Sequence, residues 1–122
     1  MTRVINWFEI PAADFERAVA FYENVFGIEL KREDGNGRRV GLFPYQGEAT
    51  GGSVCEASAE DAGMGGPLIY LEAGTDVGAV LSRVETHGGR VVTKPTRISD
   101  DIGDIGVFID TEGNRVGVHR AP

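Results

Sequence analysis

Two stretches of the chain repeat apolar residues at three- and four-residue spacing, and an aspartate stands before each. Residues with this spacing fall on one face of an α-helix, so each stretch predicts a helix that buries one stripe. Asp14 and Asp76 are suited to accept hydrogen bonds from the free N–H groups at the two helix starts. Gly27 and Gly89 are expected to end the two helices. The stripes are formed by Phe15, Ala18, Val19, Tyr22 and Phe26 in the first half and by Val77, Val80, Leu81 and Val84 in the second.

Strand-like patterns surround each predicted helix. Pro11 is expected to end the first strand, because proline has no N–H to donate to a ladder. Turn-forming residues at 34–37 and 110–114 join neighbouring strands into hairpins, and we interpret the second turn as structural. The predicted strands are 4–10, 28–33, 39–45 and 53–57 in the first half, and 67–73, 90–93, 105–109 and 115–119 in the second.

The two halves repeat at an offset of 62 residues. Asp14 falls on Asp76, Gly27 falls on Gly89, and the glycine before the last strand also recurs. This period is too long for a solenoid unit and indicates a duplicated module of one strand, one helix and three strands. The aperiodic segment 58–66 is the predicted linker between modules of about 4–57 and 66–119. We therefore expect a single α+β domain, 1–122, of paired βαβββ modules that form a cup-shaped mixed sheet around one shared core.

Composition narrows the classes of partner. The chain has 122 residues, 12 basic against 19 acidic side chains, and a formal net charge of −7. This charge disfavours nucleic acid and anionic membranes as partners, because no basic cluster is present to release counterions. Cys55 is the single cysteine, so no internal disulfide is expected. The chain start lacks the apolar run of a signal peptide, and the sequence predicts a cytoplasmic protein.

Several motifs, in this order, resemble the vicinal oxygen chelate superfamily, which includes lactoylglutathione lyase, extradiol dioxygenases, fosfomycin-resistance transferases and bleomycin-binding proteins. The resemblance covers nearly the whole chain and implies the glyoxalase-like fold. It does not imply one function, because the same fold serves lyases, oxygenases, transferases and binders. The motifs are Phe8-Glu9-Ile10-Pro11, Asp14-Phe15-Glu16-Arg17-Ala18, Phe21-Tyr22, Phe26-Gly27, Gly88-Gly89 and Asp110-Thr111-Glu112-Gly113-Asn114-Arg115.

The resemblance also implies where a metal would bind. The metal enzymes of this superfamily draw ligands, usually His and Glu, from the first and fourth strand of each module. The corresponding positions here are Trp7, Cys55, Ile69 and Gly117. The side chains of Trp7 and Ile69 cannot bind a metal, and Gly117 has no side chain. The single thiol of Cys55 is a poor ligand for a magnesium- or manganese-type ion. We therefore expect no metal cofactor at these positions.

A displaced site is an alternative. By strand alternation Glu9 shares a face with Trp7, so Glu9, Cys55 and His119 could converge as a soft metal site or a thiol–imidazole pair. The other interpretation is that Glu9 is a hydrogen-bonded acid near the cup, Cys55 a small buried apolar residue, and His119 a polar residue near the chain end.

Aromatic residues are the remaining candidates for the cup. Trp7 could fill the core or stack on a planar ligand, and Phe43, Tyr45 and Phe108 could face the cup wall or the core, depending on strand register. The favoured function is a small-molecule-binding protein without the usual metal ligands. The alternatives are a metal-dependent lyase, isomerase or dioxygenase with displaced ligands, and a non-catalytic interaction subunit. The sequence identifies no catalytic residue. The candidate ligand-binding residues are Trp7, Glu9, Phe43, Cys55, Ile69, Phe108, Gly117 and His119.

A homodimer is expected as well. Each four-stranded sheet has edge strands, and a symmetric partner would cover them. The resemblance implies pairing too, either with both modules of a cup from one chain or with modules exchanged between chains. We expect the first arrangement, because the 58–66 linker is long enough to fold back.

Overall fold

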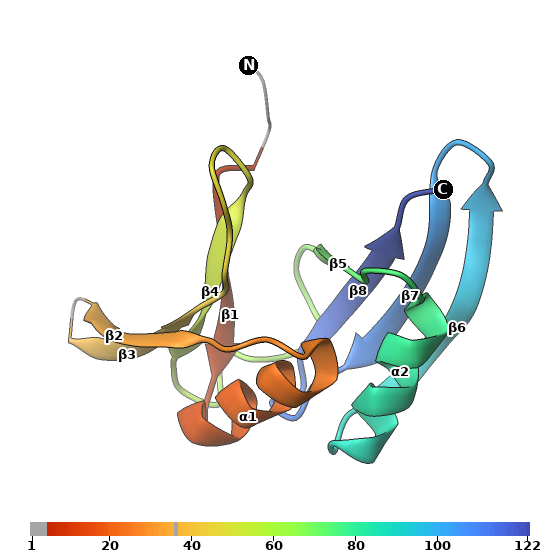
Figure 1. The fold of residues 1–122 in the computed structure, drawn as a ribbon. Helices are drawn as coiled ribbons and strands as arrows, with labels where there is room; N and C mark the ends of the chain where they lie inside the picture. Colours follow the sequence, from red (N-terminus) through yellow and green to blue (C-terminus); the bar gives the residue numbers. More distant parts are fainter. Residues whose placement is uncertain (1–4, 36) are drawn as a thin grey trace.

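The computed structural model describes residues 5–35 and 37–122 (Figure 1). Val4 of the first predicted strand and Asn36 of the first predicted turn lie outside the described residues. Each half has the predicted order of one strand, one helix and three strands. The elements are β1 (Trp7–Ala12), α1 (Phe15–Phe26), β2 (Lys31–Gly35), β3 (Arg38–Leu42), β4 (Gly51–Glu56), β5 (Tyr70–Glu72), α2 (Val77–Thr86), β6 (Arg90–Ser99), β7 (Gly103–Ile109) and β8 (Arg115–Arg120).

Both helices begin where the capping aspartates predict, and α1 ends at Gly27 as predicted, but α2 ends at Thr86, three residues before Gly89, with His87 as its C-cap. The Asp14 carboxylate accepts a hydrogen bond from the Arg17 N–H at 3.1 Å. The Asp76 carboxylate accepts hydrogen bonds from the N–H groups of Gly78 and Ala79. Gly27 ends α1 in the left-handed conformation, at φ 64°, which glycine adopts without a steric cost.

The strands form two four-stranded mixed sheets. The first has the order β1-β4-β3-β2 and the second the order β5-β8-β7-β6. In each sheet the first and last strands of the module pair in parallel, and the other pairs are antiparallel. This arrangement confirms the α+β, glyoxalase-like fold class, with two sheets that are each built by one module.

The helix-covered faces of the two sheets share one hydrophobic core. On the first sheet, a Cβ at Gly41 would lie 3.3 Å from Val19 of α1; on the second, a Cβ at Gly106 would lie 2.6 Å from Leu81 of α2. Helix α1 also contacts the second sheet, because the rings of Phe21 and Phe108 are 5.9 Å apart. The two modules therefore pack through their helices, and Figure 1 shows both helices on the same side of the molecule.

Two expectations about strand ends are wrong. Pro11 does not end β1, which continues to Ala12. Strand β1 lies at the edge of its sheet, so the N–H that Pro11 lacks is not needed to pair with a further strand. Strand β6 runs to Ser99, six residues past the predicted end, with shifts of register along its pairing with β7. Among the described residues, no helix is long and apolar enough to cross a membrane.

Candidate functional site

The face of the first sheet that points away from the helices carries polar side chains beside aromatic ones. Glu9 of β1 pairs in register with Ser53 of β4, and Pro11 pairs with Cys55. Paired residues share a face, so Glu9, Ser53 and Cys55 lie together, with Trp7 one pair further along. We call this surface the first outer face.

Ser53 and Cys55 form a buried polar pair on this face. The Ser53 Oγ and Cys55 Sγ atoms lie 3.1 Å apart, and both side chains are almost fully buried. Burial raises the pKa of the Cys55 thiol, and the hydrogen bond with Ser53 opposes that shift only in part. The thiol is therefore protonated at neutral pH, which suits a packing or hydrogen-bonding group better than a nucleophile.

A partly exposed ion pair lies beside the buried pair. The Arg38 guanidinium contacts the Glu9 carboxylate at 3.4 Å, with about half of each side chain exposed. Such a pair contributes little to stability, because water screens it and both side chains stay mobile. Its charges remain accessible to a polar group of a ligand.

Two aromatic rings continue the first outer face. The rings of Trp7 and Tyr45 meet edge to face, with centroids 5.9 Å apart. Gly51 lies beneath both, since a Cβ there would be 2.6 Å from the Tyr45 ring and 2.9 Å from the Trp7 ring. Trp7 is 41% exposed and Tyr45 51% exposed, so the rings offer a flat apolar surface to a ligand.

The second sheet has a matching outer face. Tyr70 of β5 pairs with Gly117 of β8, and its ring lies over the space that a Gly117 side chain would fill. His119 is on the same face, and its Nε2 atom is 2.6 Å from the Ile102 carbonyl oxygen. An open apolar cavity of about 400 Å³ adjoins them. It is lined by Tyr70, Ile98, Ile102, Ile105 and His119.

The two outer faces point away from each other within one chain, and among the described residues they approach only at the linker, where Glu9 and Arg115 line one cavity. Helix α1 packs against both sheets, with Tyr22 in ring contact with Phe43 on one side and Phe108 on the other. The helix-covered faces thus point toward each other, and the outer faces point away. The expectation that one chain closes a cup around the ligand site is therefore wrong. Consistently, Glu9 and His119 line different cavities.

Three of the predicted site residues do not lie on the outer faces. Phe108 is fully buried in the core, and Phe43 and Ile69 pack against that core. The 62-residue offset places Ile69 opposite Trp7 of the first module, but the connection to the helix is longer after β5 than after β1. A one-residue shift reverses the face of every side chain in a strand, so Tyr70 takes the outer position.

Sequence reasoning also missed three outer-face residues, Arg38, Ser53 and Tyr70, whereas Tyr45 was among the candidates for the cup wall. The alternation of Ser53 and Cys55 about the buried Val54 is the one signal in the sequence that could have placed Ser53 with Cys55.

The residues at the four superfamily ligand positions do not fit a divalent metal. Trp7 and Cys55 share the first outer face, Gly117 has no side chain, and Ile69 packs against the core. Within residues 5–35 and 37–122, no group of three or more His, Cys, Asp or Glu side chains is placed to hold an ion.

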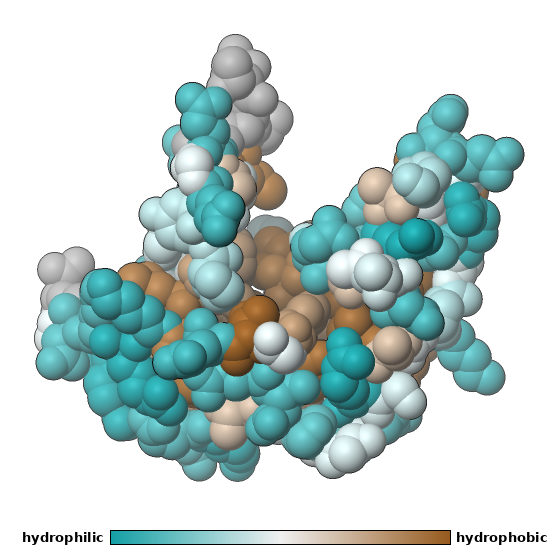
Figure 2. Space-filling view, viewed as in Figure 1, coloured by the Kyte–Doolittle hydropathy of each residue, from teal (hydrophilic) through white to brown (hydrophobic). Residues whose placement is uncertain are grey.

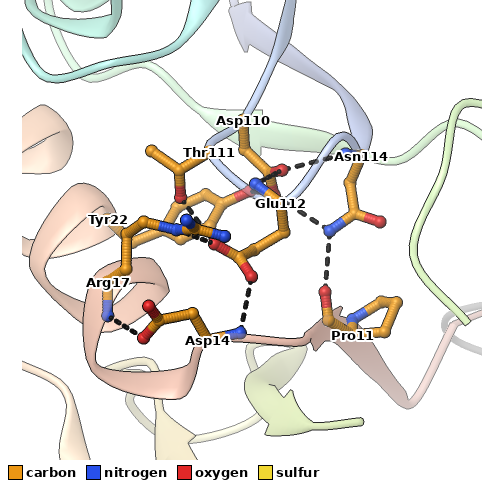
Figure 3. A network of polar contacts seen from close by, with 8 residues as sticks. All are labelled: Pro11, Asp14, Arg17, Tyr22, Asp110, Thr111, Glu112 and Asn114. Carbon is orange, nitrogen blue, oxygen red and sulfur yellow. Dashed lines mark hydrogen bonds and ion pairs between the residues drawn. The ribbon is translucent and has the colours of Figure 1, made fainter. Parts of the chain in front are cut away.

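The 110–114 turn binds the two modules together (Figure 3). Asp110 accepts a 2.7 Å hydrogen bond from the Tyr22 hydroxyl of α1, and Asn114 donates to the Pro11 carbonyl of β1 at 2.8 Å. Glu112 accepts hydrogen bonds from the Asp14 N–H and the Arg17 side chain, both at 2.8 Å. These contacts give the turn a structural role, because each crosses from the second module to the first.

Comparisons with known proteins give the same fold throughout the chain. A "Glyoxylase-like domain-containing protein" from Didymella fabae is 26% identical over 122 residues, covering 97% of this chain and 94% of that protein. The fosfomycin resistance protein FosX from Listeria monocytogenes superposes with a TM-score of 0.69 at 15% identity, covering 100% of this chain and 94% of its own. A glyoxalase/bleomycin resistance protein from Albidiferax ferrireducens gives a TM-score of 0.67 at 17% identity, covering 97% and 98%.

The two structural likenesses show the fold alone, because function varies widely among proteins of one fold. The family model for the Glyoxalase/Bleomycin resistance protein/Dioxygenase superfamily matches residues 4–118, which is almost the whole chain. The chain therefore belongs to the Glyoxalase/Bleomycin resistance protein/Dioxygenase superfamily.

Proposed function

We propose that this protein binds a small, mainly apolar molecule on its outer faces without a metal at the four superfamily ligand positions. The observation that carries the proposal is the composition of the first outer face. Exposed Trp7 and Tyr45 rings flank the buried Ser53–Cys55 pair and the accessible Glu9–Arg38 ion pair. An apolar surface with a few placed polar groups is the usual composition of a small-molecule site.

The cup for this ligand needs a second copy of the chain. Each outer face is open, and exposed apolar side chains lie on both, with Trp7 and Tyr45 on the first and Tyr70, Ile98 and Ile102 on the second. In a two-fold dimer, the first outer face of one copy would lie opposite the second outer face of the other. Two equivalent cups would result, each enclosed by both copies.

The binding proposal is tested with a neutral apolar reporter dye, N-phenylnaphthylamine. Trp7 is the single tryptophan, so ligand stacked on it would quench the intrinsic fluorescence at the same concentrations that enhance the emission of the dye. Replacing Trp7 with Ala is expected to weaken dye binding about tenfold or more. The control is Val92→Ala, which also removes an exposed apolar side chain and should leave binding unchanged.

Metal analysis of protein purified without chelator separates this function from the enzyme alternative. In a two-copy cup, Glu9 and Cys55 would face the sheet that carries the partner's His119, which is the observation that favours a displaced metal site. Stoichiometric metal that is lost in Glu9→Gln or His119→Ala would establish that alternative. Absence of metal together with dye binding supports the binder, and absence of both supports an interaction subunit.

A further inference from the structure

An apolar trough runs between the two modules, above the helices in the view of Figures 1 and 2. Figure 2 shows a hollow between the two upper arms of the molecule, with hydrophobic residues at its base. Two cavities, of about 440 Å³ and about 310 Å³, make up the trough and share Phe8, Thr50, Leu71 and Glu72. The two cavities adjoin each other at these shared residues, and each is in the size range of small-molecule sites.

The base of the trough is a packed aromatic cluster. The Phe8 and Phe43 rings are 5.4 Å apart, and the Phe43 and Tyr22 rings are 5.6 Å apart. Tyr22 is fully buried and hydrogen-bonded to Asp110, so it holds the base of the trough in place. A ligand would therefore meet a preformed surface, which lowers the entropic cost of binding.

The walls come from both modules. Ile5, Phe8 and Thr50 belong to the first module, and Leu68, Ile69 and Leu71 belong to the second. The trough is separate from the outer faces, because Leu71 pairs with Val118, which is buried in the core beneath the helices. It therefore exists in one chain and does not need a second copy.

Glu72 is the one charged side chain among the residues that line the two cavities, and it lines both. It is exposed, and its Oε2 atom accepts a 3.0 Å hydrogen bond from the Gly74 N–H. A carboxylate retains capacity for further donors after one such bond. An apolar trough with a single carboxylate at its rim complements an apolar molecule that carries one cationic donor.

We propose that the trough between the modules is a second ligand site, which binds an apolar molecule bearing a protonated amine. The aromatic base takes the apolar body, and the Glu72 carboxylate accepts hydrogen bonds from the ammonium group. This site is independent of the proposed outer-face site, since no lining residue other than Tyr70 is common to the two.

The test compares two probes of equal shape, phenylbutylamine and phenylbutanol, by calorimetric titration at fixed low salt. The amine should bind about fivefold more tightly than the alcohol, the value expected for one partly exposed charged hydrogen bond. Glu72→Gln should abolish this difference and leave the affinity for the alcohol unchanged. The matched control Glu60→Gln alters an exposed carboxylate outside the trough and should keep the difference.

Backbone amide signals locate the bound probe. Binding in the trough predicts shifts at Leu71 and Phe8 that persist in Trp7→Ala protein. Failure of the outer-face proposal would leave this result intact, so the two are distinguishable. Equal affinities for amine and alcohol in the unmodified protein, a preference that survives Glu72→Gln, or binding lost in Trp7→Ala would each overturn the proposal.

Discussion

At the scale of single residues, Asp110 is the most heavily hydrogen-bonded side chain at the module junction. Its Oδ1 atom accepts from the N–H groups of Glu112 and Asn114, and its Oδ2 atom accepts from the Tyr22 hydroxyl and the Asn114 side chain. Burial raises the pKa of Asp110, and the hydrogen bonds from Tyr22 and Asn114 oppose that rise. Removing one hydrogen-bond donor to the buried Asp110 carboxylate should therefore lower the free energy of unfolding.

Tyr22→Phe tests that expectation. The change deletes one hydrogen bond to a buried carboxylate and leaves the ring in place, so the free energy of unfolding should fall by about 1.5–3 kcal/mol. Urea denaturation followed by circular dichroism measures it. The control Tyr45→Phe alters an exposed ring and should stay within about 0.5 kcal/mol. Equal effects of the two substitutions would show that the Asp110 hydrogen bond does not stabilise the junction.

Glu112 makes the junction sensitive to acid. Burial opposes its ionisation, but hydrogen bonds from Arg17, the Asp14 N–H and Thr111 outweigh burial and lower the pKa of Glu112 below its ordinary value. A lowered pKa in the folded state stabilises the protein above the ordinary glutamate pKa, and this stability is lost as the pH falls through the lowered value. Unfolding free energies at neutral pH and at about pH 4 should therefore differ less in Glu112→Gln than in the unmodified protein. A similar change in Glu60→Gln would contradict a specific role for Glu112.

At the scale of elements, the close approach of the two helices to β7 depends on Gly89. A Cβ at this position would lie 2.8 Å from the Ile109 carbonyl oxygen and 2.9 Å from the Phe21 ring. The carbonyl oxygen belongs to the sheet backbone and cannot move without shifting β7. The same position also contacts Val84 of α2, so one added methyl group would strain three elements at once.

Gly89→Ala should therefore lower the free energy of unfolding by about 1–3 kcal/mol through overpacking. Gly65→Ala is the matched control, because nothing lies within 4 Å of its added Cβ and its φ is not in the left-handed region. Thermal denaturation of both variants measures the difference. A Gly89→Ala protein as stable as its control would show that the elements can separate without cost.

The elements were predictable where local chemistry determines them, and the site was predictable only in part. Asp14, Asp76 and Gly27 fix the helix ends through contacts within a few residues, and the structure places them as the sequence predicts. The outward direction of Tyr70, and the inward direction of Ile69, depend on the length of the β5–α2 connection and on pairing with β8, which are long-range properties. The direction of Phe43 depends on long-range strand pairing in the same way.

At the scale of the whole molecule, the two outer faces point apart because α1 packs against the inner faces of both sheets. Single exposed apolar residues are ordinary on protein surfaces, but Trp7, Tyr45 and Tyr70 lie on faces that contain the candidate site. In the proposed dimer, a second copy would cover both the exposed rings and the open cavity beside His119.

The mass in solution follows from this arrangement. Light scattering at micromolar concentration should give twice the 13.1 kDa of one chain. Ile102→Asp adds a charge to the second outer face, where a covering partner would bury it, and should shift the mass toward one chain. The control substitution Glu60→Asp lies in the linker and should leave the mass unchanged. A mass of one chain for the unmodified protein would contradict the dimer.

Mixing two variants tests the two-copy cup most directly. Trp7→Ala damages the first outer face and Tyr70→Ala the second, so neither variant alone has an undamaged cup. In a mixed dimer, one cup carries both substitutions and the other carries none, so an equimolar mixture with free exchange should restore about one cup in four. The number of high-affinity N-phenylnaphthylamine sites measures this. Sites that reappear on mixing support a cup built from two copies, whereas a mixture that binds no better than its components would contradict it.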